Sequence, residues 1–141
     1  MKTNPLRYPR AAGLLLAFGV ALTSALPSAA LAQKLDANGI ERTEVVRRDL
    51  DATREAIQVR VDFGPGALAP RHSHPGVELA YVLEGTIEYE LEGKAVVLKA
   101  GESLFIPAGA VHSAKNHGSS QASELATYLV EKGKPVVVMA R

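Results

Sequence analysis

Hydrophobic and polar positions alternate along much of the chain, as they do in β-strands that bury one face. The clearest example is the segment 56–63, in which every second residue is apolar. The apolar face of this segment holds Ile57, Val59, Val61 and Phe63. The segment 86–93 repeats the pattern, with Ile87, Tyr89 and Leu91 opposite Glu88 and Glu90. Each segment is therefore expected to form a half-buried strand, with the two glutamates on its solvated face.

Short apolar segments separated by turn residues recur at intervals of about 8–12 residues, and no segment beyond residue 32 keeps a helical period over several turns. The expected strands are 43–50, 56–63, 77–85, 86–93, 94–101 and 102–109. Further strand-like segments follow at 111–118 and 136–140. The sequence therefore predicts an all-β domain, built either as a sandwich or as a barrel.

The N-terminal part of the chain has a different pattern. A leader with three basic residues precedes the uncharged apolar run 11–26, and Ala30 and Ala32 then offer an A-x-A cleavage site before Gln33. These three parts predict a secretory signal peptide. The alternative is a membrane anchor that stays attached, but the run is short for the roughly 20 residues that a membrane span needs.

We therefore expect three regions in the chain. They are a signal peptide at 1–32, an N-terminal arm at 33–42 and a single domain at 43–141. Export would place the mature protein in the periplasm or outside the cell, with no membrane attachment after cleavage.

Removal of the leader changes the charge of the protein. The whole chain has 16 basic and 15 acidic residues. Loss of the three basic residues of the leader leaves 13 basic and 15 acidic residues, a formal charge of −2. Aromatic residues are only 5% of the chain and there is no basic patch, so we expect no nucleic-acid partner. The absence of cysteine excludes disulfides, thiolate metal ligands and a cysteine nucleophile.

Two of the four histidines lie in the segment "RHSHPGVE", at positions 72 and 74. Residues two apart on a strand point to the same side, so His72 and His74 converge if the segment is extended. Glu78 can reach the same face after the turn at Pro75, and His112 lies in a second strand-like segment. Three imidazoles and a carboxylate suit iron, manganese, nickel, copper or zinc. The alternative is that these residues are ordinary hydrogen-bonding groups.

The residues around these histidines resemble the two motifs of the cupin superfamily. The first motif, G-x5-H-x-H-x3-4-E-x6-G, is matched at every position by Gly66, His72, His74, Glu78 and Gly85. The second motif, G-x5-P-x-G-x2-H-x3-N, is matched by Gly101, Pro107, Gly109, His112 and Asn116. The glycines stand where strands must turn, and glycine allows a positive φ there. We interpret Asn116 as a turn-forming residue.

The resemblance implies a fold and a site. The fold would be a small cupin-type double-stranded β-helix barrel, with a divalent transition metal held in its mouth by His72, His74, Glu78 and His112. His117 lies outside both motifs and is expected to face solvent. Arg60 could point into the barrel or into solvent. Tyr81 is expected in the core or an interface and Tyr89 packed, and few polar residues are expected to line the barrel beyond the metal ligands.

Cupins perform many reactions, so the resemblance leaves the function open. The favoured hypothesis is a metal-dependent dioxygenase that acts on a small organic molecule, in which Glu78 could also serve as a base. An isomerase or a decarboxylase is possible within the same class. The alternative is a non-catalytic module in the periplasm that binds a metal or a small ligand. By analogy with small cupins, the strands at the two ends of the domain would pair with a neighbour and make a homodimer.

Overall fold

The computed structural model describes residues 35–141, so the expected signal peptide lies outside the described residues. The described part contains ten strands: β1 (Ile40–Asp49), β2 (Arg54–Phe63), β3 (Leu68–Ser73), β4 (Gly76–Glu84), β5 (Thr86–Leu91), β6 (Lys94–Lys99), β7 (Ser103–Ile106), β8 (His112–Lys115), β9 (Ala122–Glu131) and β10 (Val138–Met139). Residues 35–141 contain no helix long and apolar enough to cross a membrane.

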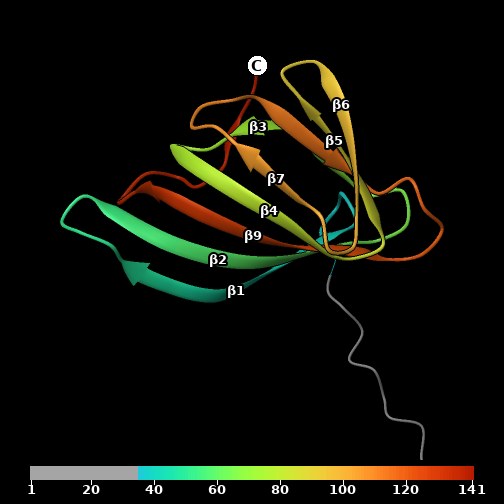
Figure 1. The fold of residues 1–141 in the computed structure, drawn as a ribbon, viewed down its shortest axis with the longest axis horizontal. Helices are drawn as coiled ribbons and strands as arrows, with labels where there is room; N and C mark the ends of the chain where they lie inside the picture. The colour runs from blue at the N-terminus through green and yellow to red at the C-terminus, as the bar shows by residue number, and fades with distance from the viewer. Residues whose placement is uncertain (1–34) are drawn as a thin grey trace, which may run out of the picture. The chain divides into compact units, whose positions relative to one another are not determined.

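The strands form two five-stranded antiparallel sheets (Figure 1). The first sheet has the order β1-β2-β9-β4-β7, and the second has the order β10-β3-β8-β5-β6. Strands that follow one another in the chain repeatedly lie in different sheets. The chain therefore winds between the two sheets, and each sheet is not built from independent hairpins. This is the double-stranded β-helix that the resemblance implied, and the all-β fold class is confirmed.

The core lies between the two sheets and follows the alternation seen in the sequence. Strand β2 buries Ile57, Val61 and Phe63 of the apolar face expected for it, and Val59 is half-buried. Other fully buried apolar side chains come from β1, β4, β5, β7 and β9, and they include Ile40, Val82, Ile87, Ile106 and Val130. The opposite faces of the strands are more exposed, as expected for a barrel filled by its own side chains.

The ends of several expected strands differ from the observed ones. β1 begins at Ile40, within the expected N-terminal arm, and β3 begins at Leu68, between the expected strands 56–63 and 77–85. The segment 124–135, which sequence analysis left unassigned, lies mostly in β9, at the centre of the first sheet. A central strand makes ladder hydrogen bonds on both sides, and this tertiary pairing is not visible in a local pattern.

Two glycines illustrate how the turns constrain the sequence. Gly85 connects β4 to β5 with a φ of 73°, and a Cβ at this position would lie 2.8 Å from the Cβ of Ala122. Gly76 begins β4, and a Cβ there would lie 2.0 Å from the carbonyl oxygen of Leu129. Position 85 requires a left-handed backbone conformation, and position 76 requires a residue without a side chain. The four motif glycines all have positive φ, as the sequence predicted.

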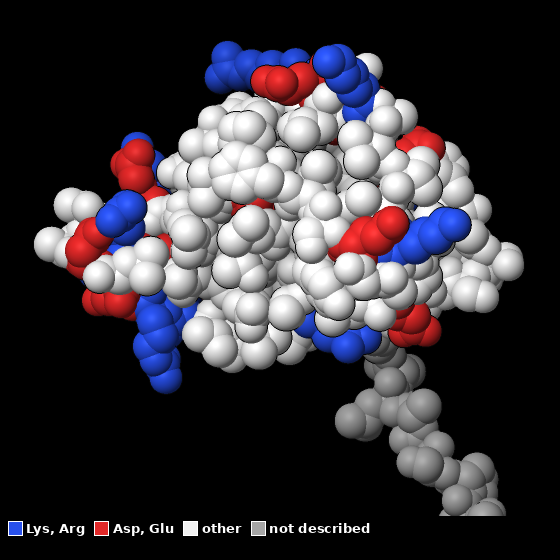
Figure 2. Space-filling model, viewed as in Figure 1, with Lys and Arg blue, Asp and Glu red and all other residues white. Residues whose placement is uncertain are grey.

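One outer surface of the first sheet is notably apolar. Leu79, Tyr81 and Leu83 on β4 and Phe105 on β7 are exposed. Figure 2 shows few charged side chains in the middle of the face in view, over β4 and β7, and charged groups toward its margins. Tyr81 therefore lies on an outer surface and does not belong to the core.

Candidate metal centre

Three histidines from two neighbouring strands of the second sheet meet inside the barrel. His72 lies in β3, His74 follows directly after that strand, and His112 is the first residue of β8. β3 and β8 are antiparallel, with His72 opposite His112. The two-residue spacing places His72 and His74 on the same side, as the alternation of a strand predicts.

An irregularity between β3 and β8 sets the side to which these rings point. The register pairs Ala69 with Ala114 and then His72 with His112, so β3 has one more residue than β8 between the two pairs. Such a bulge shifts the alternation of the strand by one residue. Ala69 is buried in the core, and in a regular strand a residue three positions later would point to the opposite side. The extra residue therefore turns His72 inward as well.

The three imidazoles are close enough to share one ion. Their ring centroids are separated by 4.3 Å (His72 to His112), 4.9 Å (His72 to His74) and 5.0 Å (His74 to His112). One ligand nitrogen from each ring lies within 4.8 Å of the others. All three side chains are buried, so their unpaired nitrogens have little access to bulk water.

The backbone fixes the orientation of each ring. The Nδ1 atoms lie against main-chain carbonyl oxygens: Pro70 at 2.6 Å for His72, Val136 at 2.5 Å for His74 and Ala110 at 3.1 Å for His112. A carbonyl oxygen can only accept a hydrogen bond, so Nδ1 carries the proton in each case. In the neutral ring the Nε2 lone pair is then free, which is the arrangement that metal-binding histidines adopt.

Glu78 brings a carboxylate to the same place from the first sheet. It lies in β4, and its Oε2 is 2.9 Å from Nε2 of His74 and 3.2 Å from Nε2 of His112. Burial by itself raises the pKa of Glu78, but the adjacent His112 and His74 lower it, and the net pKa is about 2. Burial also lowers the pKa of His72 to about 4. Near neutral pH the cluster therefore holds an ionised carboxylate and a neutral His72.

Two atoms of this cluster have no hydrogen-bond partner. They are Nε2 of His74 and Oε2 of Glu78, which lie 2.9 Å apart without hydrogen-bond geometry. Buried polar atoms are nearly always satisfied, so two orphaned atoms facing each other need an explanation. Both are Lewis bases, and a shared cation would satisfy both. The donor set of nitrogen and carboxylate oxygen therefore fits a divalent transition metal.

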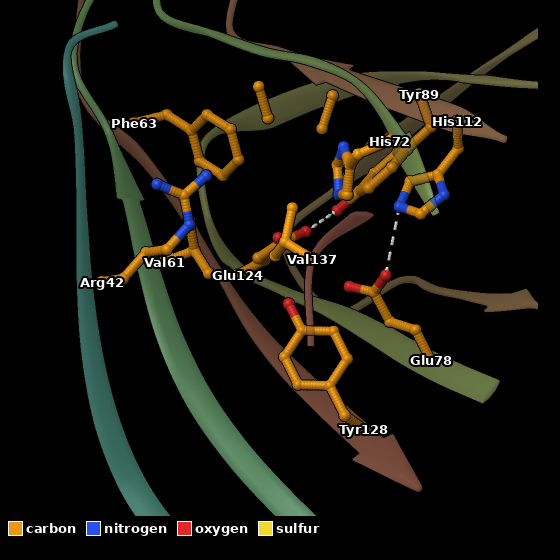
Figure 3. A pocket seen from close by; sticks show the side chains of 12 residues that line it. Arg42, Val61, Phe63, His72, Glu78, Tyr89, His112, Glu124, Tyr128 and Val137 are labelled. Carbon is orange, nitrogen blue, oxygen red and sulfur yellow. Dashed lines mark hydrogen bonds and ion pairs between the residues drawn. The ribbon is translucent and has the colours of Figure 1, made fainter. Parts of the chain in front are cut away.

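A small cavity adjoins the cluster, and polar groups line it in addition to the proposed ligands (Figure 3). Its volume is about 20 Å³, enough for about one water molecule. The wall includes His72, Glu78, His112, Tyr89, Glu124 and Tyr128, and Arg42 lies at its edge. The expectation that few polar residues line the barrel is therefore wrong, because β1, β5 and β9 each contribute polar side chains.

Glu124 is the least expected of these residues. It is buried on β9, and its Oε2 accepts a hydrogen bond from the hydroxyl of Tyr89. Burial, followed by the negative charge of Glu78, raises the pKa of Glu124 to about 8. Burial also raises the pKa of Tyr89 well above its ordinary value. Near neutral pH Glu124 is therefore largely protonated in the metal-free protein.

A signal for Glu124 exists in the sequence. In β9, Glu124 falls on the same face as Ala126, Tyr128 and Val130, and all four are buried. A glutamate in phase with an apolar face is a candidate for an inward-facing polar group. This face becomes visible in the sequence only when the segment 124–135 is assigned as a strand.

The other residues considered in the sequence lie away from the cluster. His117 is exposed and its Nε2 lies 3.2 Å from Glu88. Asn116 is buried and holds a turn: its Nδ2 donates to three main-chain carbonyls and its Oδ1 accepts from the amide of Gly118. Arg60 pairs with Asp62 outside the barrel. Tyr89 is fully buried, as expected, but it also lines the cavity.

Comparison with known proteins places these residues in a family context. The chain matches the family described as "Cupin domain" over residues 59–138, a range that contains all four residues of the cluster. "Germin-like protein subfamily 2 member 2" of Arabidopsis thaliana is 41% identical over 75 residues, which cover 49% of this chain and 34% of the relative. This chain therefore spans only about a third of that relative's length.

Solved structures support the same fold. A recombinant oxalate oxidase in complex with glycolate superposes with a TM-score of 0.62 and 27% identity, over 74% of this chain and 56% of the other. A conserved protein with a double-stranded β-helix domain from Klebsiella pneumoniae gives a TM-score of 0.63 and 21% identity, over 77% and 91% of the two chains. The second likeness concerns the fold alone.

Proposed function

This chain belongs to the cupin domain family, and from that premise we propose that it is a metalloenzyme of the dioxygenase type that acts on a small organic molecule. The proposed ligands of one divalent transition metal are His72, His74, Glu78 and His112. The observation that carries the proposal is the orientation of the three imidazoles. Each commits its Nδ1 to a main-chain carbonyl, and the free nitrogens of His74 and His112 lie beside the ionised carboxylate of Glu78.

Iron, manganese, nickel, copper or zinc would suit the donor set, and when bound would supply Lewis acidity and, for the redox-active ions, chemistry with O₂. The chain's own residues provide the surroundings. Burial of the cluster keeps bulk water away from the reacting atoms. Glu124 presents a carboxyl group to the cavity, and Tyr89 fixes its position. Glu78 is the candidate base if its carboxylate leaves the ligand set.

The oxalate oxidase likeness supports a redox role more than an isomerase or decarboxylase role. The decisive experiment has two parts. Elemental analysis of the purified protein should find about one transition metal per chain, and the iron-loaded protein should consume O₂ when a substrate is added. The variant Glu78→Gln keeps the shape of the side chain but removes its charge, and it should lower metal affinity at least tenfold. Full metal content in Glu78→Gln after dialysis against a chelator would contradict the ligand assignment.

A second candidate function is a non-catalytic module that binds a metal or a small ligand. The cavity volume of about 20 Å³ favours it, since this space leaves little room for a substrate beside the ion. The two candidates differ in O₂ consumption. A metal-loaded protein that binds small molecules without consuming O₂ would favour the binding module.

We further propose that the protein is exported and forms a homodimer. β1 and β10 are edge strands of the two sheets, as the sequence analysis required for pairing with a neighbour. Both strands expose apolar side chains, among them Val45, Val46, Val138 and Met139. Exposed apolar edge strands favour association. Light scattering of the purified protein should give the mass of two chains, and the mass of one chain would contradict the dimer.

A further inference from the structure

A second, larger cavity lies next to the small one. Its volume is about 220 Å³, and it shares Arg42, Tyr128 and Val137 with the cavity at the metal centre. We call this space the vestibule. Its remaining lining is Glu44, Arg47, Ile57, Val59 and Val136. The vestibule therefore combines an apolar wall with two arginines, and it adjoins the proposed metal site.

One of the two arginines is already fully engaged. Arg47 donates to Glu44 through Nε and Nη2 and to Glu55 through Nη1, at distances between 2.8 and 3.2 Å. A bulge in β1 between Glu44 and Val46 makes this possible, because it places Glu44 and Arg47 on the same side of the strand. The charge of Arg47 is balanced within the protein, so Arg47 has little left to offer a ligand.

Arg42 is in a different position. Within residues 35–141 its one hydrogen bond runs from Nη1 to Asp36, at 3.2 Å and on the exposed side. Its Nε and Nη2 hydrogens remain available, and together they form the edge of the guanidinium that matches a carboxylate. Figure 3 shows the guanidinium pointing inward, toward Phe63 and above Glu124. Arg42 thus presents unused donors where the two cavities meet.

We infer that Arg42 binds the carboxylate of a small monocarboxylic acid whose apolar body packs on Ile57, Val59 and Val136 in the vestibule. This inference rests on the proposed function and names the class of its substrate. The carboxylate end would then face the metal centre. A volume of about 220 Å³ is below the roughly 300–1,000 Å³ of pockets for drug-sized ligands, so the molecule is of the size of a short fatty acid or a single-ring acid.

The charges around the site favour a monoanion over a dianion. Among the described residues that line the two cavities, Arg42 is the cation with donors to spare, because Arg47 is already paired with Glu44 and Glu55. A second carboxylate on a ligand in the vestibule would be desolvated without a second side-chain cation to pair with it. Neutral amides of the same shape would lose the charge-assisted contact and leave the guanidinium unpaired.

The test is calorimetric titration of the metal-loaded full-length chain with butyrate and benzoate, and with butyramide, benzamide and succinate. Both monocarboxylates should bind at least about tenfold more tightly than their amides, and more tightly than succinate. Arg42→Gln should weaken benzoate binding about tenfold to a hundredfold, as for loss of a bidentate charged contact. Arg42→Lys keeps the charge but not the planar edge, and it should give an intermediate loss.

The matched control is Arg48→Gln, which removes the same charge from an exposed neighbour that does not line either cavity. Its benzoate affinity should equal that of the unmodified protein. Equal benzoate affinity in Arg42→Gln, or equal affinity for benzoate and benzamide, would overturn the inference. Metal content is measured in every sample. A chain that holds metal but does not bind the monocarboxylates refutes this inference and leaves the proposed function untouched. A chain that holds no metal refutes the proposed function.

Discussion

The hydroxyl of Tyr89 donates a hydrogen bond to the buried carboxyl of Glu124, and this bond joins β5 of the second sheet to β9 of the first. No lysine or arginine forms an ion pair with Glu124 among the described residues. An isolated carboxylate would be costly at this depth, and the group avoids that cost by keeping its proton. The bond therefore ties together the two sheets at the wall of the cavity.

This arrangement predicts an unusual pH dependence for the metal-free protein. The pKa of Glu124 is about 8 in the folded state and lies near 4.5 in the unfolded state, so only the folded state keeps the proton between these values. Stability from this residue is therefore present below about pH 4.5 and is lost as pH rises through about 8. Glu124→Gln should remove this decline and raise the free energy of unfolding at pH 8 by about 1–3 kcal/mol relative to the unmodified protein.

Urea unfolding at pH 5, 6.5 and 8, with a chelator present, measures the effect. Glu90→Gln is the control, because Glu90 is exposed on the strand that carries Tyr89. If the free energy of unfolding falls between pH 5 and 8 as steeply in Glu124→Gln as in the unmodified protein, Glu124 is ionised in the folded protein.

Asn116 should matter for stability and not for the metal. Its side chain makes four hydrogen bonds to the main chain around the loops that follow β2 and β8. Asn116→Ala leaves these buried groups unsatisfied and should destabilise the protein by about 2–3 kcal/mol. Metal affinity should stay within about threefold, because the residue touches no proposed ligand. Thermal unfolding and metal titration of the same sample separate the two effects, and a large loss of metal affinity without loss of stability would contradict this role.

Metal binding should compete with protons. Burial lowers the pKa of His112, but the contact with Glu78 outweighs it and the net pKa is raised, whereas burial brings the pKa of His72 to about 4. Acid should therefore displace metal by protonating His112 before His72. Metal affinity should therefore begin to fall as the pH drops through the raised pKa of His112, above the ordinary histidine value of about 6.5, and holo-protein stability should fall with it.

The control for this experiment is His117→Ala, since His117 is exposed and paired with Glu88 on the surface. Its metal-binding pH profile should coincide with that of the unmodified protein, whereas His72→Ala, His74→Ala and His112→Ala should lose metal at neutral pH. A shifted profile in His117→Ala would mean that the ligand set is incomplete.

The proposed export provides a separate prediction about the N-terminus. Cleavage after Ala32 should give a mature chain that begins at Gln33. Intact mass spectrometry of protein recovered from the periplasm or the medium measures this directly, and a mass that includes residues 1–32 would exclude cleavage. Ala32→Pro should block processing and leave the longer chain.

Much of the fold follows from local patterns in the sequence. Alternation in 56–63 and 86–93 predicted the two strands and their buried faces, and spacing predicted that His72 and His74 share a side. β9 was left unassigned, and its residues from Leu125 to Val130 place apolar side chains on both faces, so apolar and polar positions do not alternate. Its identity as a strand comes from pairing with β2 and β4, which are distant in the chain.

The convergence of His72, His74, Glu78 and His112 was predictable from the sequence, and the walls of the cavity were not. The motif residues carry a spacing that can be recognised in one dimension. Arg42, Glu124 and Tyr128 come from strands outside the motifs, and their convergence depends on the order in which the sheet is assembled. A bulge also decides which way Arg47 points, and no local signal announces where an extra residue will fall.

The anchoring of the three imidazoles has a consequence for how this site tolerates sequence change. All three Nδ1 acceptors are main-chain carbonyls, at Pro70, Ala110 and Val136. A substitution can delete a side chain but cannot delete a carbonyl oxygen. Substitutions at these three positions therefore leave each histidine with its proton on Nδ1. Insertion, deletion or truncation is what would remove an anchor, and loss of the chain after Pro135 would free His74 without altering any residue of the cluster.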